Sequence, residues 1–215
     1  MRRLSLILII TGVLVLLYPL LDRAYTCYWQ QKIFSKWGAG HLQENMNTEK
    51  DIGAELDETE VNFEENENEA NFSSESETIL RNTLGILEIE KINLKLPILR
   101  GTSKAILRVG AGLLDGTAGI GELGNTVLTA HRSHTYGRFF NRLDEMEPGD
   151  RITISTKDGE LYHYVVCRTL IVEVGDTSIF EVDEGDRILT LYTCDPLYSV
   201  NPVNRLIVQA RLETE

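Results

Sequence analysis

Short apolar segments follow one another from Thr83 to Leu212, and residues that favour turns separate each from the next. The expected strands cover residues 83–90, 94–99, 111–115, 125–131, 151–156, 161–174, 188–194 and 205–212. Glycine, proline and aspartate occupy the intervals, as in Glu147-Pro-Gly-Asp150. Helix is expected only near 103–109 and 138–146. About eight short strands with little helix predict an all-β barrel or sandwich.

The N-terminus carries a continuous apolar run. Leu4 to Leu21 follows Met1-Arg2-Arg3 and contains 18 residues, the lower end of what spans a bilayer core. We expect an uncleaved anchor, because no small-residue cleavage site follows and the residues before Cys27 match a lipidation signal poorly. Since the arginines favour the inner side, we expect a single-pass protein of the cell membrane, with its N-terminus cytoplasmic and its folded domain extracellular.

An acidic stretch separates this run from the strands. Residues 43–77 hold 13 acidic side chains against Lys50, a net of −12, which equals the net charge of the whole chain. Such a segment buries too little apolar surface to fold, and about 36 residues reach on the order of 30 Å as a flexible spacer. The remaining charges balance, so no basic surface for nucleic acid is expected.

Three regions are therefore predicted. Residues 1–42 form a cytoplasmic tip, a transmembrane anchor and a juxtamembrane segment, and residues 43–78 form the disordered acidic linker. Residues 79–215, about 137 residues, are enough for one ordinary hydrophobic core.

The three cysteines, Cys27, Cys167 and Cys194, lie far apart and form no C-x-x-C pair. This spacing indicates neither a thiolate metal site nor a disulfide framework, so no metal or other cofactor is expected, and a calcium requirement is left open. Cys167 lies inside a β-rich run and is interpreted as packed core. Cys194 ends a strand beside a loop, where a thiol is held rigidly and still meets solvent.

Two other strand ends carry groups that could act with this thiol. His131 ends the strand 125–131, and Arg205 opens the strand 205–212. A thiol, an imidazole and a guanidinium can serve as nucleophile, acid–base group and oxyanion partner. Arg132 and His134 are rival candidates near His131. A second interpretation stays open at this point: a catalytically silent, wall-anchored β-domain that binds a partner and buries Cys194.

The residues around these positions resemble a known family. Thr190-Leu-Tyr-Thr-Cys194 matches the T-L-x-T-C signature of sortases, and Thr129-Ala-His131-Arg132 is similar to their histidine segment. Arg205 follows the cysteine by about a dozen residues, as the sortase arginine does. The resemblance covers about residues 84–212 and includes the N-terminal anchor. It implies a closed eight-stranded β-barrel with one or two short helices, preceded by a transmembrane helix.

The resemblance also implies a chemistry, because sortases are cell-wall transpeptidases of Gram-positive bacteria with a cysteine-peptidase type of hydrolysis. Cys194 is expected to cleave an LPxTG-like sorting signal and form a thioester, with His131 as general acid and base. Arg205 is expected to hold the substrate and the oxyanion, and Thr193 to line the substrate groove. The implied partners are secreted surface proteins with such a C-terminal signal, the amine of a lipid II-type peptidoglycan precursor, and the membrane.

The subclass rests on finer features. The segment from His131 to Asp144 and Thr193-Cys-Asp-Pro196 look most like class D sortases, with the pilus-building class C as the closest alternative. Class C enzymes usually carry an aromatic Asp-Pro-Trp type of lid and a C-terminal membrane segment, and neither is seen here. Ala130 stands where many relatives have glycine before the histidine.

Overall fold

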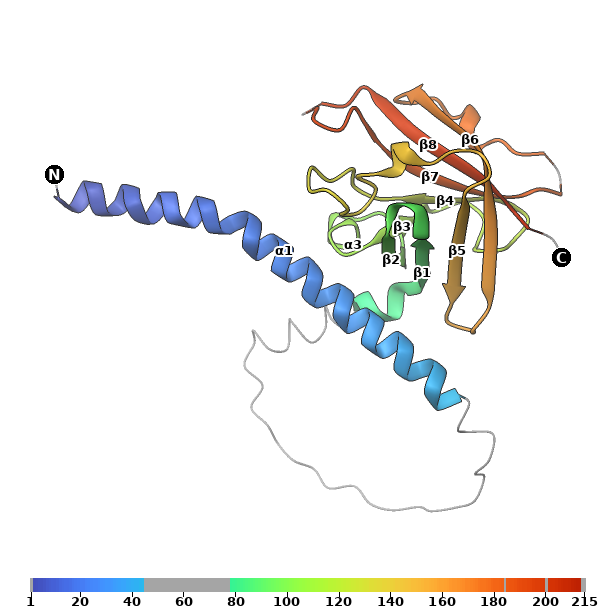
Figure 1. The fold of residues 1–215 in the computed structure, drawn as a ribbon, viewed down its shortest axis with the longest axis horizontal. Coiled ribbons are helices and arrows are strands. Elements are labelled where there is room, and N and C mark those ends of the chain that lie inside the picture. Colours follow the sequence, from blue (N-terminus) through green and yellow to red (C-terminus); the bar gives the residue numbers. More distant parts are fainter. Residues whose placement is uncertain (1, 45–77, 184, 200, 214–215) are drawn as a thin grey trace, which may run out of the picture.

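The computed structural model describes residues 2–44, 78–183, 185–199 and 201–213. A long helix precedes a set of strands (Figure 1). The elements are α1 (Arg2–Glu44), β1 (Thr83–Ile89), η2 (Glu90–Ile92), β2 (Leu94–Arg100), α3 (Lys104–Leu107), β3 (Ala111–Leu113), β4 (Gly124–Thr129), η3 (Leu143–Glu145), β5 (Arg151–Thr156), β6 (Leu161–Glu173), η4 (Ser178–Phe180), β7 (Arg187–Asp195) and β8 (Asn204–Leu212). Each strand expected from the sequence overlaps one of these.

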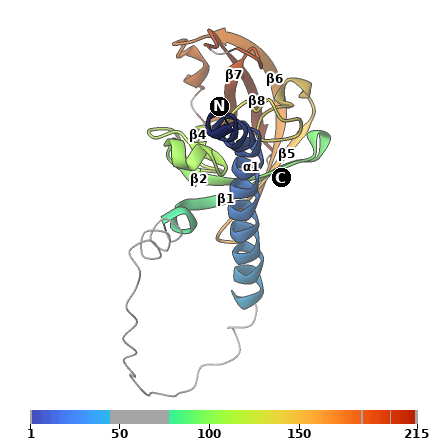
Figure 2. The ribbon, with the colours of Figure 1, turned by 90° about the vertical axis from the view of Figure 1, so that its left-hand side faces the viewer.

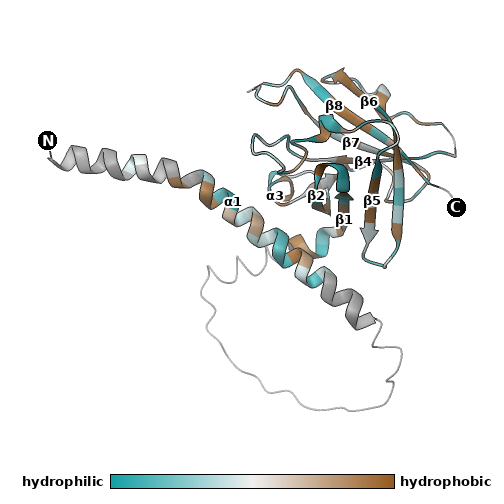
Figure 3. Ribbon diagram, viewed as in Figure 1, coloured by the Kyte–Doolittle hydropathy of each residue, from teal (hydrophilic) through white to brown (hydrophobic). Residues whose placement is uncertain are grey.

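The strands close into a barrel in the order β1-β2-β3-β4-β7-β8-β6-β5. The pairs β2·β3 and β4·β7 are parallel, and the other neighbours in this order are antiparallel. Alternate side chains point inward, so that Leu87, Leu128, Leu191 and Val208 meet in one buried core. Brown apolar bands mark the strands in Figure 3. The expected closed barrel is confirmed, and the sandwich is excluded.

A buried polar network fixes η4 to the outside of the barrel wall. Thr190 Oγ1 donates to Asn125 Oδ1 at 2.7 Å, and Gln209 Nε2 donates to Thr190 Oγ1 at 2.9 Å. Gln209 Nε2 and Asn125 Nδ2 also donate to the carbonyl of Ile179, at 2.8 and 3.2 Å. Because buried polar groups are costly unless they are hydrogen-bonded, this network gives η4 one position over β4, β7 and β8.

Two expectations about the barrel are wrong. Residues 138–146 form only the short 3-10 turn η3 instead of a helix, because Phe139 has a left-handed φ of 51° that interrupts helical geometry. Cys167 is exposed instead of packed in the core. Tyr164 and Val166 point into the core, so by alternation Cys167 lies on the outer face of β6.

The second half of α1 lies along the outside of the barrel near β1 and β2, whereas its first half projects beyond the barrel (Figures 1 and 2). Trp29 and Ile33 of α1 are 0% and 1% exposed. They pack in a second apolar cluster with Ile86, Leu99 and Val109. Strands β1 and β2 are therefore buried on both faces, which explains their nearly unbroken apolar character.

In the part of the chain that the structure describes, no helix meets the length and hydropathy expected of a membrane span. The anchor over Leu4 to Leu21 remains a prediction. The acidic linker predicted over 43–78 lies almost entirely outside the described residues. Its reach of about 30 Å as a spacer stays a prediction.

We predict that Trp29→Ala loosens α1 from the barrel. Truncating a fully buried tryptophan costs about 3–5 kcal/mol of packing free energy, and local opening governs amide exchange. Hydrogen exchange along residues 25–37 should accelerate by at least about tenfold. Tyr28→Ala is the matched control, since Tyr28 is 48% exposed. Equal exchange in the two variants would contradict the packing described.

Candidate active site

The parallel pairing of β4 with β7 brings His131 beside Cys194. The register pairs Thr129 with Tyr192, and the contact continues past β4 because the amide of Ala130 donates to the carbonyl of Tyr192 at 3.4 Å. Two residues further along each chain stand His131 and Cys194, at the same end of the barrel. The two candidate groups, 63 residues apart in sequence, are neighbours in the fold.

The antiparallel pairing of β7 with β8 adds the arginine. Cys194 and Arg205 are direct cross-strand partners, a position in which side chains share one face at about 5 Å between Cβ atoms. Leu189 and Leu191 point into the core, so by alternation Cys194 lies on the outer face. The expected meeting of Cys194, His131 and Arg205 at one place is thus built by two strand registers.

Aromatic side chains continue this outer face away from the cysteine. The Arg205 guanidinium lies 5.8 Å from the centre of the Tyr192 ring, and the ring of Phe180 from η4 lies 6.4 Å from that of Tyr192. Arg205 Nη1 also donates to the carbonyls of Pro202 and Asn204, at 3.1 and 2.8 Å. The arginine is therefore held at the end of β8 by local contacts on two sides.

Thr193, which was expected to line the substrate groove, is buried. Its side chain is 1% exposed and its Oγ1 donates to the carbonyl of Ala130 at 2.8 Å. Alternation directs it into the barrel, because it shares a face with Leu191. Thr193 therefore does not line an open groove, and it fixes the backbone that leads into His131.

An ion pair joins the two residues that directly follow His131 and Cys194. Arg132 Nη1 donates to Asp195 Oδ1, and Arg132 Nη2 lies 3.2 Å from Asp144 Oδ2. The side chains of Arg132 and Asp195 are only 7% and 15% exposed. Since Arg132 follows His131 and Asp195 follows Cys194, this pair ties the two catalytic candidates together. Arg132 is thus a structural partner of the site and not the rival acid–base group considered above.

The loop after β4 holds the imidazole in place. The amide of Phe140 donates to the carbonyl of His131 at 3.1 Å, and Asn141 Nδ2 donates to the carbonyl of Ser133 at 2.6 Å. The ring of Phe139 meets that of His131 edge-on, with 6.2 Å between the centroids. A left-handed residue such as Phe139 is strained, and it persists only where its surroundings hold it in place. Here the strained residue contacts the His131 ring.

His131 opens into a pocket of about 330 Å³. The residues that line this pocket are Asp22, Arg108, His131, Arg132, Ser133, His134, Arg138 and Phe139. Partial burial lowers the pKa of His131 and the charge of Arg138 lowers this pKa further, while the charge of Asp22 opposes both. The balance favours the neutral imidazole, the form that can accept a proton. His134 is exposed and its ring lies 5.2 Å from that of Tyr198.

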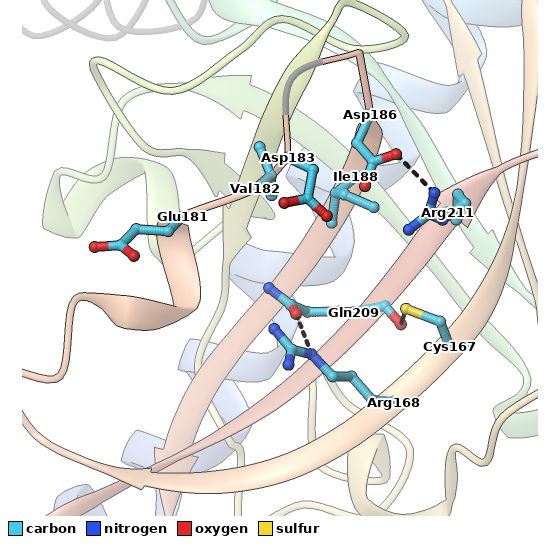
Figure 4. Close-up of a pocket in the computed structure, with 9 residues that line it drawn as sticks. All are labelled: Cys167, Arg168, Glu181, Val182, Asp183, Asp186, Ile188, Gln209 and Arg211. Carbon is cyan, nitrogen blue, oxygen red and sulfur yellow. Dashed lines mark hydrogen bonds and ion pairs between the residues drawn. The ribbon is translucent and has the colours of Figure 1, made fainter.

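A larger hollow of about 480 Å³ lies elsewhere, over β6, β7 and β8 (Figure 4). Cys167, Arg168, Asp183, Gln209 and Arg211 are among its lining residues. Cys194, His131 and Arg205 are not among them, so its size does not make it the catalytic site. Among the described residues, no three His, Cys, Asp or Glu side chains gather closely enough to hold a metal ion.

Comparison with known proteins identifies the family. The sortase domain model matches residues 87–213, more than half of the 215-residue chain. The chain belongs to the sortase family. Sortase D of Bacillus subtilis (strain 168) is 37% identical over 131 residues, which cover 60% of this chain and 64% of that protein. The sequence-based resemblance to sortases, and to class D in particular, is confirmed by this similarity.

Solved sortase structures share the fold. Sortase C1 from Streptococcus agalactiae is 33% identical, with a TM-score of 0.58 over 63% of this chain and 70% of that one. Sortase C from Clostridium perfringens with the C-terminal cell wall sorting motif is 32% identical, with a TM-score of 0.56 over 62% of this chain and 71% of that one. The matched part of this sortase is therefore its barrel, and it spans less than two thirds of the curated B. subtilis relative.

Sequence reasoning missed Asp22, Arg138 and Asn141. Arg138 and Asn141 lie in a segment that was expected to be helical. Asp22 lies in a helix, and no pattern in the sequence predicts that this helix packs against the barrel. A carboxylate directly after an apolar run is a weak sign of a site, and only the fold shows its position.

We predict that Asp195→Asn lowers the free energy of unfolding by about 3 kcal/mol, because it leaves the buried Arg132 without its closest carboxylate. Urea unfolding monitored by circular dichroism measures this change. Asp186→Asn is the control, since it breaks an Arg–Asp pair in which Arg211 is 60% exposed, and it should cost less than about 1 kcal/mol. Similar losses in both variants would contradict the buried-pair description.

Proposed function

We propose that this chain is a cysteine transpeptidase that cleaves an LPxTG-like sorting signal and transfers the new carboxyl end to an amine. The observation that carries the proposal is the pair of registers that align Cys194 with Arg205 on β8 and place His131 beside them. A thiol, an imidazole and a guanidinium on one outer face can complete an acyl transfer.

The first half of the proposed reaction forms a thioester. The neutral imidazole of His131 takes the thiol proton of Cys194, and the thiolate attacks the carbonyl carbon of the threonine in the signal. The negative charge that develops on the carbonyl oxygen is met by the Arg205 guanidinium, which is charged at every relevant pH. The C–N bond then breaks, and the leaving amine takes the proton from His131.

The second half resolves the thioester. An incoming amine attacks the same carbonyl carbon, His131 receives the proton that the amine loses, and the C–S bond breaks. The sulfur of Cys194 regains a proton from His131, which restores the starting state. We propose that the amine comes from a lipid II-type peptidoglycan precursor and that the acyl donors are secreted surface proteins.

Tyr192 and Phe180 form an aromatic surface next to Arg205. Such a surface suits the leucine and proline of the signal, because aromatic rings bury apolar groups at low entropic cost. The similar C. perfringens sortase C with a C-terminal cell wall sorting motif supports this class of substrate. Pilin polymerisation is the second candidate, favoured by the 33% identity to sortase C1, and a lysine side-chain acceptor preferred over a cell-wall amine would support it.

We also propose that α1 anchors the enzyme as a single-pass protein of the cell membrane. The apolar run from Leu4 to Leu21, and the arginines that precede it, support a cytoplasmic N-terminus and an extracellular barrel. An extracellular barrel would meet both secreted proteins and cell-wall amines.

We predict that Cys194→Ala abolishes both cleavage of an LPxTG-type peptide and the acyl-enzyme adduct seen by intact mass spectrometry. Cys167→Ala, which removes an exposed thiol of the barrel away from Arg205, should leave both signals unchanged. A Cys194→Ala variant that keeps full turnover would refute the proposed nucleophile. Failure of Cys194 to react with a thiol reagent in the native protein would favour the silent binding domain.

We predict that Arg205→Gln lowers kcat/KM for the same peptide by about 10²-fold or more, the scale on which a lost oxyanion donor acts. Arg211→Gln is the matched control, because Arg211 lies on the same strand but pairs with Asp186 at the other end of the β7·β8 register. Peptide cleavage followed by chromatography measures both. An unchanged kcat/KM for Arg205→Gln would remove the arginine from the mechanism.

A further inference from the structure

Asp22 of α1 lies in the pocket that holds His131. Its Oδ1 is 3.3 Å from Arg108 Nη2, and its Oδ2 is 3.1 Å from Arg138 Nη2. Both arginines belong to the barrel, and all three side chains line the pocket together with His131. The N-terminal helix thus contributes a charged side chain to the His131 pocket. The other residues that line this pocket lie more than 80 positions after Asp22 in the sequence.

Independent contacts fix α1 in this position. Thr26, one turn after Asp22, donates to the carbonyl of Arg108 at 3.2 Å and accepts from Arg138 Nη2 at 2.5 Å. Gln30, a further turn on, donates through Nε2 to the carbonyl of Val109 at 2.9 Å. The buried Trp29 and Ile33 follow on the same side of the helix. Asp22 is therefore held over the pocket by a docked helix and not by its own ion pairs alone.

Asp22 offsets part of the positive charge around His131. Basic groups dominate the pocket wall, and Asp22 is the acid among its lining residues that the structure describes. Arg132 is already matched by Asp195 and Asp144. Arg108 and Arg138 form their ion pairs with Asp22. The charged and titratable groups near the imidazole are Asp22 from α1, Arg108 after α3, Arg132, His134 and Arg138 after β4, Cys194 and Asp195 from β7, and Arg205 from β8.

We propose that Asp22 is a positioning residue for the reaction at Cys194, because it fixes Arg138 and sets the charge around His131, so that α1 completes a site that the barrel alone leaves unfinished. This inference rests on the proposed transpeptidase function. It also means that a fragment beginning near residue 79 lacks part of the wall of the His131 pocket.

The proposal predicts that two substitutions shift the pKa of His131 in opposite directions. The negative charge of Asp22 raises the pKa of His131, and the positive charge of Arg138 lowers it. Asp22→Asn removes the first effect and leaves Arg138 without its carboxylate, so both changes lower the pKa of His131. Arg138→Gln removes the second effect and leaves Asp22 less neutralised, so the pKa of His131 rises.

The test is a pH titration of the His131 imidazole by NMR in the full-length chain. The sequence has four histidines, and the spectrum of His131→Asn assigns the relevant signals. We expect the midpoint to move to lower pH in Asp22→Asn and to higher pH in Arg138→Gln, while Asp22→Glu stays close to the unmodified protein. Gln30→Ala, which removes a docking contact without changing charge, should leave the midpoint in place.

Activity provides the second readout. At neutral pH, kcat for an LPxTG-type peptide should fall about three- to tenfold in Asp22→Asn, because Arg138 loses the carboxylate that fixes it and the neutral imidazole becomes a weaker base. The change in KM should be smaller, and Asp22→Glu should restore kcat. A midpoint that moves the same way in Asp22→Asn and Arg138→Gln, or in neither, would overturn the proposal and leave α1 a docking role only. Because the titration needs no substrate, this failure is distinct from a failure of Cys194 as the nucleophile.

Discussion

The hydrogen-bonded pairing of β4 with β7 is the constraint on which the site depends. These strands are parallel, so their carboxyl ends meet at one end of the barrel. A shift of one residue in this register would send His131 and Cys194 to opposite faces. Two buried contacts beyond β4 oppose such a shift: Thr193 with the carbonyl of Ala130, and Arg132 with Asp195.

The outer face of the barrel divides into regions that are each covered by another element. The network of Asn125, Thr190 and Gln209 holds η4 over one region, and this brings Phe180 to Tyr192. α1 covers β1 and β2 through Trp29 and continues to the His131 pocket. The face that carries Cys194, His131 and Arg205 lies between these two supports, so its shape depends on segments outside the barrel.

Several of these features could be predicted from the sequence. Period-2 patterns and turn residues identify the strands, and residue chemistry with the cysteine signature identifies Cys194, His131 and Arg205. The failures have local causes. Alternation with the buried Tyr164 and Val166 turns Cys167 outward, alternation with Leu191 turns Thr193 inward, and a left-handed Phe139 ends the expected helix. The sequence pattern alone does not say which of the two alternating faces of a strand points into the barrel, because the pairing with other strands decides that.

The sequence by itself determined the strands, the family and the three chemical groups, since these follow from side-chain type and short-range order. Only the tertiary structure decided which strand lies beside which, and therefore that His131 and Arg205 flank Cys194. It alone placed Asp22 in the pocket, because α1 reaches the barrel through apolar packing at Trp29 and Ile33. The physical reason is that long-range pairing is selected by the burial and register of the whole barrel, which no single segment encodes.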